Sequence, residues 1–205
     1  QRFMFTSAIE GFAISLSLIV AIGAQNAYVL RQGLLRSHVF VVCAICAISD
    51  ALLIAAGVFG VGAWLANFEE GTFWISMFAV IFLVIYGIIR IRSALNPEGL
   101  TISNHSSESV GKVAITTLAF TWLNPHVYLD TLVLLGSASS RYQGVERELF
   151  GIGAALASLI FFFCLGYGAR LLSPIMEKPQ AWKIIDFSIA VLMFIISGAI
   201  LYAII

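Results

Sequence analysis

The sequence predicts an all-α, polytopic membrane protein of six transmembrane helices, arranged as two inverted three-helix repeats in which helices 1 and 4 are broken. Composition is the first observation: the 205 residues are 60% hydrophobic and 11% charged, with a mean hydropathy of +1.00. Soluble proteins average roughly 45–50% apolar and 25% charged residues, so this chain has too much apolar surface for that class. The apolar runs are continuous rather than alternating, which favours helices over the strands of a membrane barrel. The net charge is zero, so we expect no nucleic-acid partner.

Six apolar stretches each approach or exceed the ~20 residues that a helix needs to cross a bilayer. They cover residues 5–30, 38–66, 72–93, 111–137, 147–173 and 182–204. The one long polar segment between them divides the chain nearly in half. We therefore expect a first three-helix repeat over 1–95, a linker over 96–110 and a second three-helix repeat over 111–205.

Basic residues are distributed unevenly over the turns. Eight of the 11 lysines and arginines flank the turns after the first, third and fifth stretches: Arg31, Arg36, Arg90, Arg92, Lys112, Arg170, Lys178 and Lys183. Cytoplasmic loops of membrane proteins carry such an excess. We therefore expect a cytoplasmic linker, with both chain ends on the outer side.

The first stretch contains a predicted break at Gly23. Glycine weakens a helix, and the amides of Gln25 and Asn26 can bond the backbone groups that an unwound segment frees. Backbone of this kind is tolerated at membrane depth only where it is buried in protein or lines water.

The fourth stretch contains a second predicted break at Pro125. Proline has no backbone N–H and clashes with the carbonyl of Thr121, while Asn124 is pushed out of helical geometry because it precedes proline. A simple proline kink packed against a neighbouring helix is the alternative.

The two breaks occupy corresponding places in the halves. Tyr28 and Tyr128 lie 100 residues apart, and each follows a polar pair inside an apolar stretch. With three spans per half, the second half enters the membrane from the opposite side. This is the inverted-repeat plan of many transporters, whose site lies at the midplane between the halves.

Two carboxylates, Asp50 and Asp130, lie inside apolar stretches, where a charge costs about 3 kcal/mol or more. Asp50 is 12 residues beyond His38, about 18 Å along a helix and so near the middle of the membrane. A carboxylate there can pair with a cationic ligand and can exchange a proton. The alternatives are a structural hydrogen bond for Asp50 and an arginine partner at the membrane edge for Asp130.

Other polar side chains near the breaks are candidate ligands for the amino and carboxylate groups of a substrate. The predicted substrate-binding residues are Gln25, Asn26, Asp50, Trp122, Asn124, Tyr128 and Asp130. Asparagine and tyrosine also cap broken helices, so both roles stay open. Histidine is the side chain suited to proton exchange near neutral pH, so His126 joins Asp50 and Asp130 as a proton-coupling candidate, with simple hydrogen bonding as its alternative. Asp186 follows Lys183 by three residues, which predicts an interfacial ion pair.

We expect no cofactor and no bound metal. Cys43 and Cys46 form a C-x-x-C pair, but it lies in an apolar stretch without a matching second pair. Clusters of small residues around Gly57 and Gly153 favour close helix packing, either within one chain or between copies in a homo-oligomer.

Three sequence runs resemble the LysE family of bacterial amino-acid exporters: Ile22-Gly23-Ala24-Gln25-Asn26, Arg31-Gln32-Gly33 and Cys46-Ala47-Ile48-Ser49-Asp50. The run from Thr121 to Thr131, TWLNPHVYLDT, is similar to the arginine exporter (ArgO-type) branch. The resemblance covers nearly the whole chain. It departs at Ala24, where the family usually has proline, and at Asp186, where asparagine is more common.

The resemblance implies export of L-arginine, L-lysine and analogues across the bacterial inner membrane, driven by the proton motive force. The sequence thus predicts a secondary active exporter of basic amino acids by proton antiport, with protons and membrane lipid as its other partners. The alternatives are an exporter of neutral amino acids or of a metal cation, a non-transporting membrane subunit, and a membrane-embedded enzyme. No Gly-x-Ser-x-Gly or His-Glu-x-x-His motif occurs, so we expect no enzyme.

Overall fold

The computed structural model describes residues 2–21, 23–61, 69–95 and 108–205, and every regular element in these ranges is helical. The all-α class predicted from the sequence is confirmed for this part of the chain. In order, the elements are α1 (Arg2–Ile19), α2 (Ala24–Leu35), α3 (Val39–Val58), α5 (Glu69–Leu95), α7 (Val110–Trp122), α8 (Pro125–Tyr128), the π-helix η2 (Leu129–Leu135), α9 (Gly136–Ser139), α10 (Val145–Gly168), the 3₁₀ helix η3 (Ala169–Glu177) and α11 (Pro179–Ile204).

Four helical segments are long and apolar enough to cross a membrane: Val39–Val58, Phe73–Leu95, Val145–Leu172 and Pro179–Ile204. A fifth candidate is the pair Phe5–Ile19 and Ala24–Leu35, whose axes are bent by 83°. The predicted stretch 111–137 is divided into several pieces, and its longest, α7, has only 13 residues. By length and composition, the described residues therefore contain four candidate spans, or five with the bent pair, and the sixth stays a prediction.

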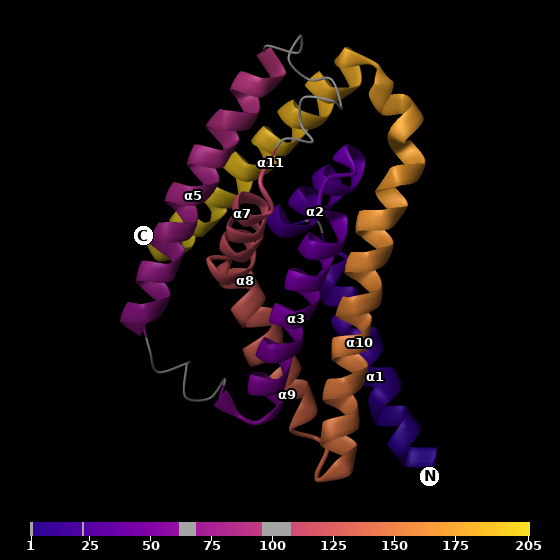
Figure 1. Ribbon diagram of the computed structural model, residues 1–205. Coiled ribbons are helices and arrows are strands. Elements are labelled where there is room, and N and C mark those ends of the chain that lie inside the picture. Colours follow the sequence, from indigo (N-terminus) through magenta and orange to yellow (C-terminus); the bar gives the residue numbers. More distant parts are fainter. Residues whose placement is uncertain (1, 22, 62–68, 96–107) are drawn as a thin grey trace.

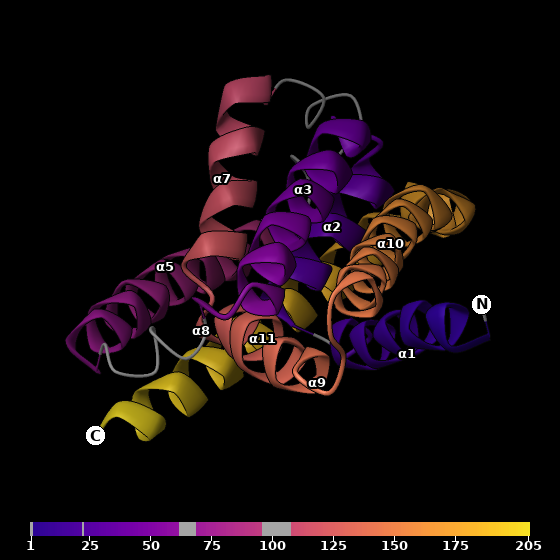
Figure 2. The same ribbon diagram turned by 90° about the horizontal axis from the view of Figure 1, so that it is seen from below.

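The long helices alternate in direction along the chain (Figure 1). In this view α1 rises from the N-terminus, α3 descends, α5 rises, the pieces from α7 to α9 descend, α10 rises, and α11 descends. Two helix pairs flank the centre: α1 packs against α10, and α5 packs against α11 (Figure 2). Helix α3 contacts α10, α7 and η2, so it lies among the segments that contain the predicted breaks.

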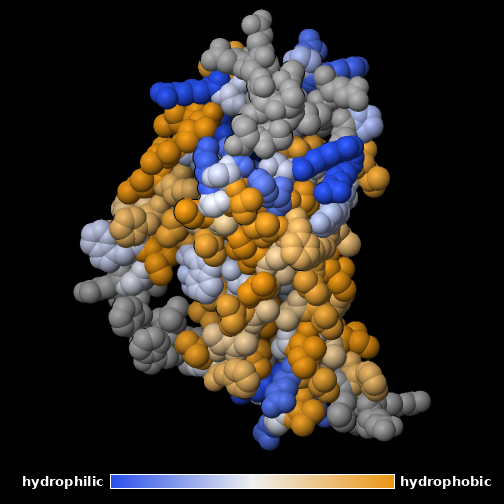
Figure 3. All heavy atoms as spheres, viewed as in Figure 1, coloured by the Kyte–Doolittle hydropathy of each residue, from blue (hydrophilic) through white to orange (hydrophobic). Residues whose placement is uncertain are grey.

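On the face seen in Figure 3, apolar residues cover much of the middle of the molecule, while hydrophilic residues gather toward its two ends. Many large apolar side chains of the described residues are strongly exposed, including Phe40 at 63%, Ile48 at 61% and Phe78 at 57%. Monomeric soluble proteins rarely expose a contiguous apolar surface of this extent. Together with the candidate spans, it identifies a multi-pass membrane protein.

Glycine allows α1 and α10 to pack backbone against backbone. A side-chain Cβ at Gly11 would overlap the carbonyl oxygen of Phe150, and one at Gly153 would overlap that of Ala8. Helix α3 approaches η2 in the same way at Gly57, next to the carbonyl of Thr131. The close packing predicted around Gly57 and Gly153 is therefore present within a single chain.

We predict that Gly153→Ala destabilises the protein, because the added methyl group must push α10 away from Ala8. Overpacking of this kind typically costs about 1–3 kcal/mol. Gly198 in α11 is the matched control, since no atom lies within 4 Å of a Cβ built there. Gly198→Ala is expected to leave stability unchanged or to raise it slightly, because alanine is the better helix former. Thermal unfolding of the purified variants in detergent measures both, and equal midpoints for the two would contradict the packing described.

Candidate functional site

The first helix break lies where it was predicted. Helix α1 ends at Ile19 and α2 begins at Ala24, with Gly23 in an extended conformation between them. The side-chain amide of Asn26 donates to the carbonyl of Ile19 at 2.7 Å and to that of Ala21 at 3.1 Å. Asn26 therefore satisfies carbonyl groups freed at the end of α1, which is the capping role that the sequence left open.

The second break lies at Leu123 and Asn124, directly before Pro125. In an uninterrupted helix the backbone N–H of His126 would donate to the carbonyl of Trp122. Here that N–H donates to the side chain of Asn124 at 3.1 Å, and the hydroxyl of Tyr128 donates to the Trp122 carbonyl at 2.6 Å. Side chains thus replace the backbone partners that the break removes.

The chain after the second break is π-helical over the seven residues of η2. This element carries Asp130. A π-helix is rare and is found frequently at functional sites, where its wider turn changes the direction of a side chain.

The two breaks are in direct contact. The amide of Gln25, at the start of α2, donates to the hydroxyl of Thr121 at 3.1 Å, and both side chains are buried. The residues are 96 positions apart, so this bond joins the two halves of the chain.

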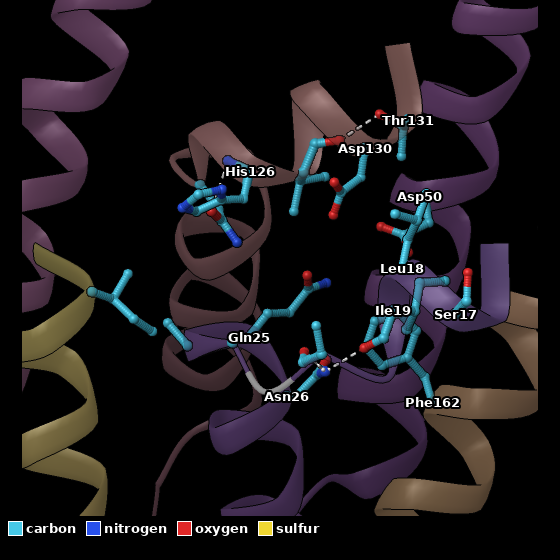
Figure 4. A pocket seen from close by; sticks show the side chains of 16 residues that line it. Ser17, Leu18, Ile19, Gln25, Asn26, Asp50, His126, Asp130, Thr131 and Phe162 are labelled. Carbon is cyan, nitrogen blue, oxygen red and sulfur yellow. Dashed lines mark hydrogen bonds between the residues drawn. The ribbon is translucent and has the colours of Figure 1, made fainter. Parts of the chain in front are cut away.

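A cavity of about 400 Å³ lies between the breaks. Its polar lining comes from both of them and from α3 (Figure 4). Asp50 and Asp130 reach it from α3 and η2, while Gln25 and Asn26 reach it from α2. His126 lines the same cavity and is exposed. The predicted proton-coupling residues therefore lie around one space.

Asp50 has an unsatisfied oxygen in this cavity. Its Oδ2 accepts a hydrogen bond of 2.8 Å from the hydroxyl of Ser158, while its buried Oδ1 has no hydrogen-bond partner in the described part of the chain. Only 4% of the residue is exposed. A buried acceptor without a donor is costly, so Oδ1 favours a proton or a cationic ligand as its partner.

Asp130 is half-buried in the wall of the cavity. Among the ion pairs that the described residues form, none includes Asp130 or Asp50. The arginine partner that the sequence offered as an alternative for Asp130 is therefore not seen in the described ranges. Both carboxylates are without a fixed counterion there.

Two of the seven predicted substrate-binding residues lie outside the cavity lining. The indole N–H of Trp122 donates to the hydroxyl of Ser49 at 3.1 Å, and Tyr128 holds the backbone of the second break. The other five line the cavity: Gln25, Asn26, Asp50, Asn124 and Asp130. Sequence reasoning missed Ser158 as the partner of Asp50, because the two residues are 108 positions apart and serine carries no local signal for this role.

Asp186 is not part of an interfacial pair with Lys183, so that prediction is wrong. The carboxylate is fully buried and accepts from Arg31 Nε at 3.0 Å and from the Ser93 hydroxyl at 2.7 Å. Arg90 Nη1 lies 3.6 Å from the same carboxylate. Lys183 is only three residues away along the helix but is exposed, whereas the tertiary fold brings two distant arginines to the buried face of α11.

Two broken helices that meet around a polar cavity, in a chain with several candidate membrane spans, are typical of membrane transport proteins. The family model described as LysE type translocator matches residues 16–203, and the chain belongs to this family. It is 39% identical over 204 residues to the "Putative amino-acid transporter YggA" of Aeromonas salmonicida, covering 97% of this chain and 99% of that protein. It is also 36% identical over 192 residues to the "Arginine exporter protein ArgO" of Serratia proteamaculans, covering 93% of this chain and 94% of that protein. No solved structure matches the chain.

We predict that water fills the cavity beside His126. In a variant whose exposed Cys164 is replaced by alanine, His126→Cys is expected to react with a charged, water-soluble thiol reagent, because the thiolate forms only in contact with water. Leu129→Cys is the matched control, since Leu129 is 47% exposed on the apolar surface but does not line the cavity. Mass spectrometry measures the modification. Equal labelling of the two variants, or none at His126→Cys, would contradict a hydrated cavity.

Proposed function

We propose that this protein is a secondary active exporter of basic L-amino acids, arginine in particular, working by proton antiport across the bacterial inner membrane. The observation that carries the proposal is that Asp50 and Asp130 line the same cavity between two broken helices. The names of the similar proteins support an amino acid as substrate, and one of them names arginine.

The proposal includes six spans in two inverted repeats, with the pieces from α7 to α9 as the fourth span. Two features support it. In the view of Figure 1 these pieces succeed one another from the upper to the lower part of the molecule, with a bend between α7 and the later pieces (Figure 2). The helix contacts also correspond between the halves: α1 and α2 pack on α10, as α7 and η2 pack on α3, while α5 packs on α11. Exchanging the two halves converts the contacts on α10 into those on α3, and it leaves the contact between α5 and α11 as it is.

The cavity offers groups for a cationic group and for the α-carboxylate of a basic amino acid. The Asp50 Oδ1 and the Asp130 carboxylate suit a guanidinium or ammonium group, because charge-assisted hydrogen bonds to carboxylates are the stronger ones. Helix α2 begins at Ala24 on the cavity wall, and the backbone N–H groups of its first turn have no intrahelical partner. These N–H groups and the positive end of the helix dipole suit the α-carboxylate.

Proton coupling follows because the substrate cation and the proton compete for the carboxylate oxygens of Asp50 and Asp130. A basic amino acid entering from the cytoplasm pairs with the carboxylates and favours their ionised form, so a proton leaves for the cytoplasm. Protonation from the outer side then removes the negative charge that holds the substrate, which is released outward. His126, exposed at the cavity, is placed to pass protons between water and Asp130.

We predict that Asp50→Asn and Asp130→Asn each reduce proton-driven arginine export by tenfold or more. Both changes keep the size of the side chain but remove the charge and the exchangeable proton. Glu148→Gln is the matched control, because Glu148 is an exposed carboxylate in the first turn of α10, outside the cavity. The measurement is transport of labelled arginine in proteoliposomes under an imposed pH gradient. If both cavity variants transport arginine against its gradient as well as the parent does, the carboxylate mechanism is wrong.

We also predict that lysine competes with labelled arginine in this assay, whereas leucine and divalent metal cations do not. Leucine lacks the side-chain cation that two carboxylates require, and within the described residues no cluster of histidine, cysteine or acidic groups has the arrangement of a metal site. Strong competition by leucine would favour the neutral amino-acid alternative. Competition by a metal cation alone would favour the metal alternative.

A further inference from the structure

A second polar cavity, of about 170 Å³, lies along α2 beyond the first one. Gln25 lines the first cavity and Arg31 lines the second, six residues or about 9 Å further along the helix. Between these positions Tyr28 stacks on Phe120 with their ring centroids 4.9 Å apart, and Tyr86 meets the same ring at 4.8 Å. Tyr28 therefore lies along α2 between the first-cavity residue Gln25 and the second-cavity residue Arg31, and it carries an aromatic cluster there.

The second cavity contains an excess of positive charge. Arg31 and Arg90 both line it, and they share the single carboxylate of Asp186. Arg31 is 2% exposed, yet its Nη2 has no hydrogen-bond partner in the described ranges, and neither do Nε and Nη1 of Arg90. Arg90 also lies 5.0 Å from the centre of the Tyr86 ring. Counting Lys112 and Glu108, which also line this cavity, three basic groups face two carboxylates, Asp186 and Glu108. An anionic ligand would balance the remaining positive charge and would accept from the unused guanidinium N–H groups.

The cavity also offers acceptors for a cation. The buried Oε1 of Gln32 has no hydrogen-bond partner among the described residues, while the Gln32 amide nitrogen donates to the Tyr28 hydroxyl at 3.1 Å. Glu108 lines the cavity next to the first turn of α7 and lies 3.1 Å from the Lys112 ammonium. Partial burial opposes ionisation of Glu108, but the hydrogen bond from Lys112 and the positive charge of that group hold the pKa of the carboxyl below its usual value. Glu108 is therefore ionised at neutral pH.

We propose that this second cavity is a separate binding site for the amino-acid substrate, in which the α-carboxylate pairs with Arg31 and Arg90 and the α-ammonium donates to Gln32. A planar carboxylate matches the N–H groups of a guanidinium in a bidentate arrangement, which a spherical anion does not. The side chain of a basic amino acid then extends toward Glu108. This inference rests on the proposed function, because it takes an amino acid as the ligand.

The position of the site agrees with export. Arg31, Arg90 and Lys112 belong to the basic set that the positive-inside tendency assigns to the cytoplasmic end. An exporter collects its substrate at that end, so the second cavity is where the amino acid binds before it passes the aromatic side chains into the first. The two sites depend on different parts of the ligand. The second requires the α-carboxylate, whereas the first holds the side-chain cation with two carboxylates and takes the α-carboxylate, where the ligand has one, at the start of α2.

Agmatine, which is arginine without its carboxylate, distinguishes the two sites. In equilibrium binding to the purified protein in detergent, we expect two molecules of labelled L-arginine per chain but only one of labelled agmatine. Arg90→Gln is expected to bind one arginine and to keep its agmatine binding. Asp50→Asn is expected to lose agmatine binding and to keep one arginine. Arg170→Gln is the matched control, because Arg170 is exposed, lies over the Tyr167 ring and does not line either cavity.

Other outcomes overturn the inference in distinguishable ways. If the parent protein binds one arginine and Arg90→Gln does not change that binding, the second site does not exist, but the proposed function stands. If the parent protein binds no basic amino acid, the proposed function itself is wrong. Displacement of one arginine by chloride or inorganic phosphate as readily as by unlabelled arginine would indicate a general anion site instead. If Arg90→Gln does not fold, Arg90→Lys keeps the charge without the bidentate geometry, and we expect it to weaken one arginine site about tenfold without changing agmatine binding. An unchanged arginine affinity in Arg90→Lys would also overturn the inference.

Discussion

The need to satisfy backbone hydrogen bonds away from water governs this structure. A helix that breaks at membrane depth frees carbonyl and N–H groups, and lipid offers them no partner. Here Asn26 caps the first break, while Asn124 and Tyr128 cap the second. The hydrogen bond from Gln25 to Thr121 then joins the two breaks, and residues of both irregular segments line one polar cavity.

The same constraint explains what could be predicted from the sequence. Gly23 and Pro125 act through local backbone chemistry, and both breaks occur where these residues predict them. Asp50 and Asp130 stand out because charge is rare in apolar stretches, and their shared cavity is consistent with the inverted plan. The sequence could not predict which polar side chains near the breaks bind substrate and which cap a helix end. Asparagine and tyrosine suit both roles, and only the geometry of the break distinguishes them.

The remaining failures concern contacts between distant segments. Asp186 has a lysine nearby in sequence, which predicts a local pair, but its partners are Arg31 and Arg90 from the other half of the chain. Ser158 likewise meets Asp50 only through the packing of α10 on α3. Such pairings depend on helix order and rotation, which a single sequence does not encode locally. The number of spans was also hard to predict. The fourth apolar stretch has the length of a span, but it folds into the pieces from α7 to α9, which include no long helix.

Proton movement measured together with arginine movement tests the central claim most directly. Proteoliposomes that contain the purified protein and a pH-sensitive dye receive an arginine gradient without an imposed pH gradient, under a clamped membrane potential. The account predicts that arginine flowing in one direction drives protons in the other, and that a protein carrying both Asp50→Asn and Asp130→Asn shows no such exchange. Arginine transport with no opposing proton movement in the parent protein would contradict it.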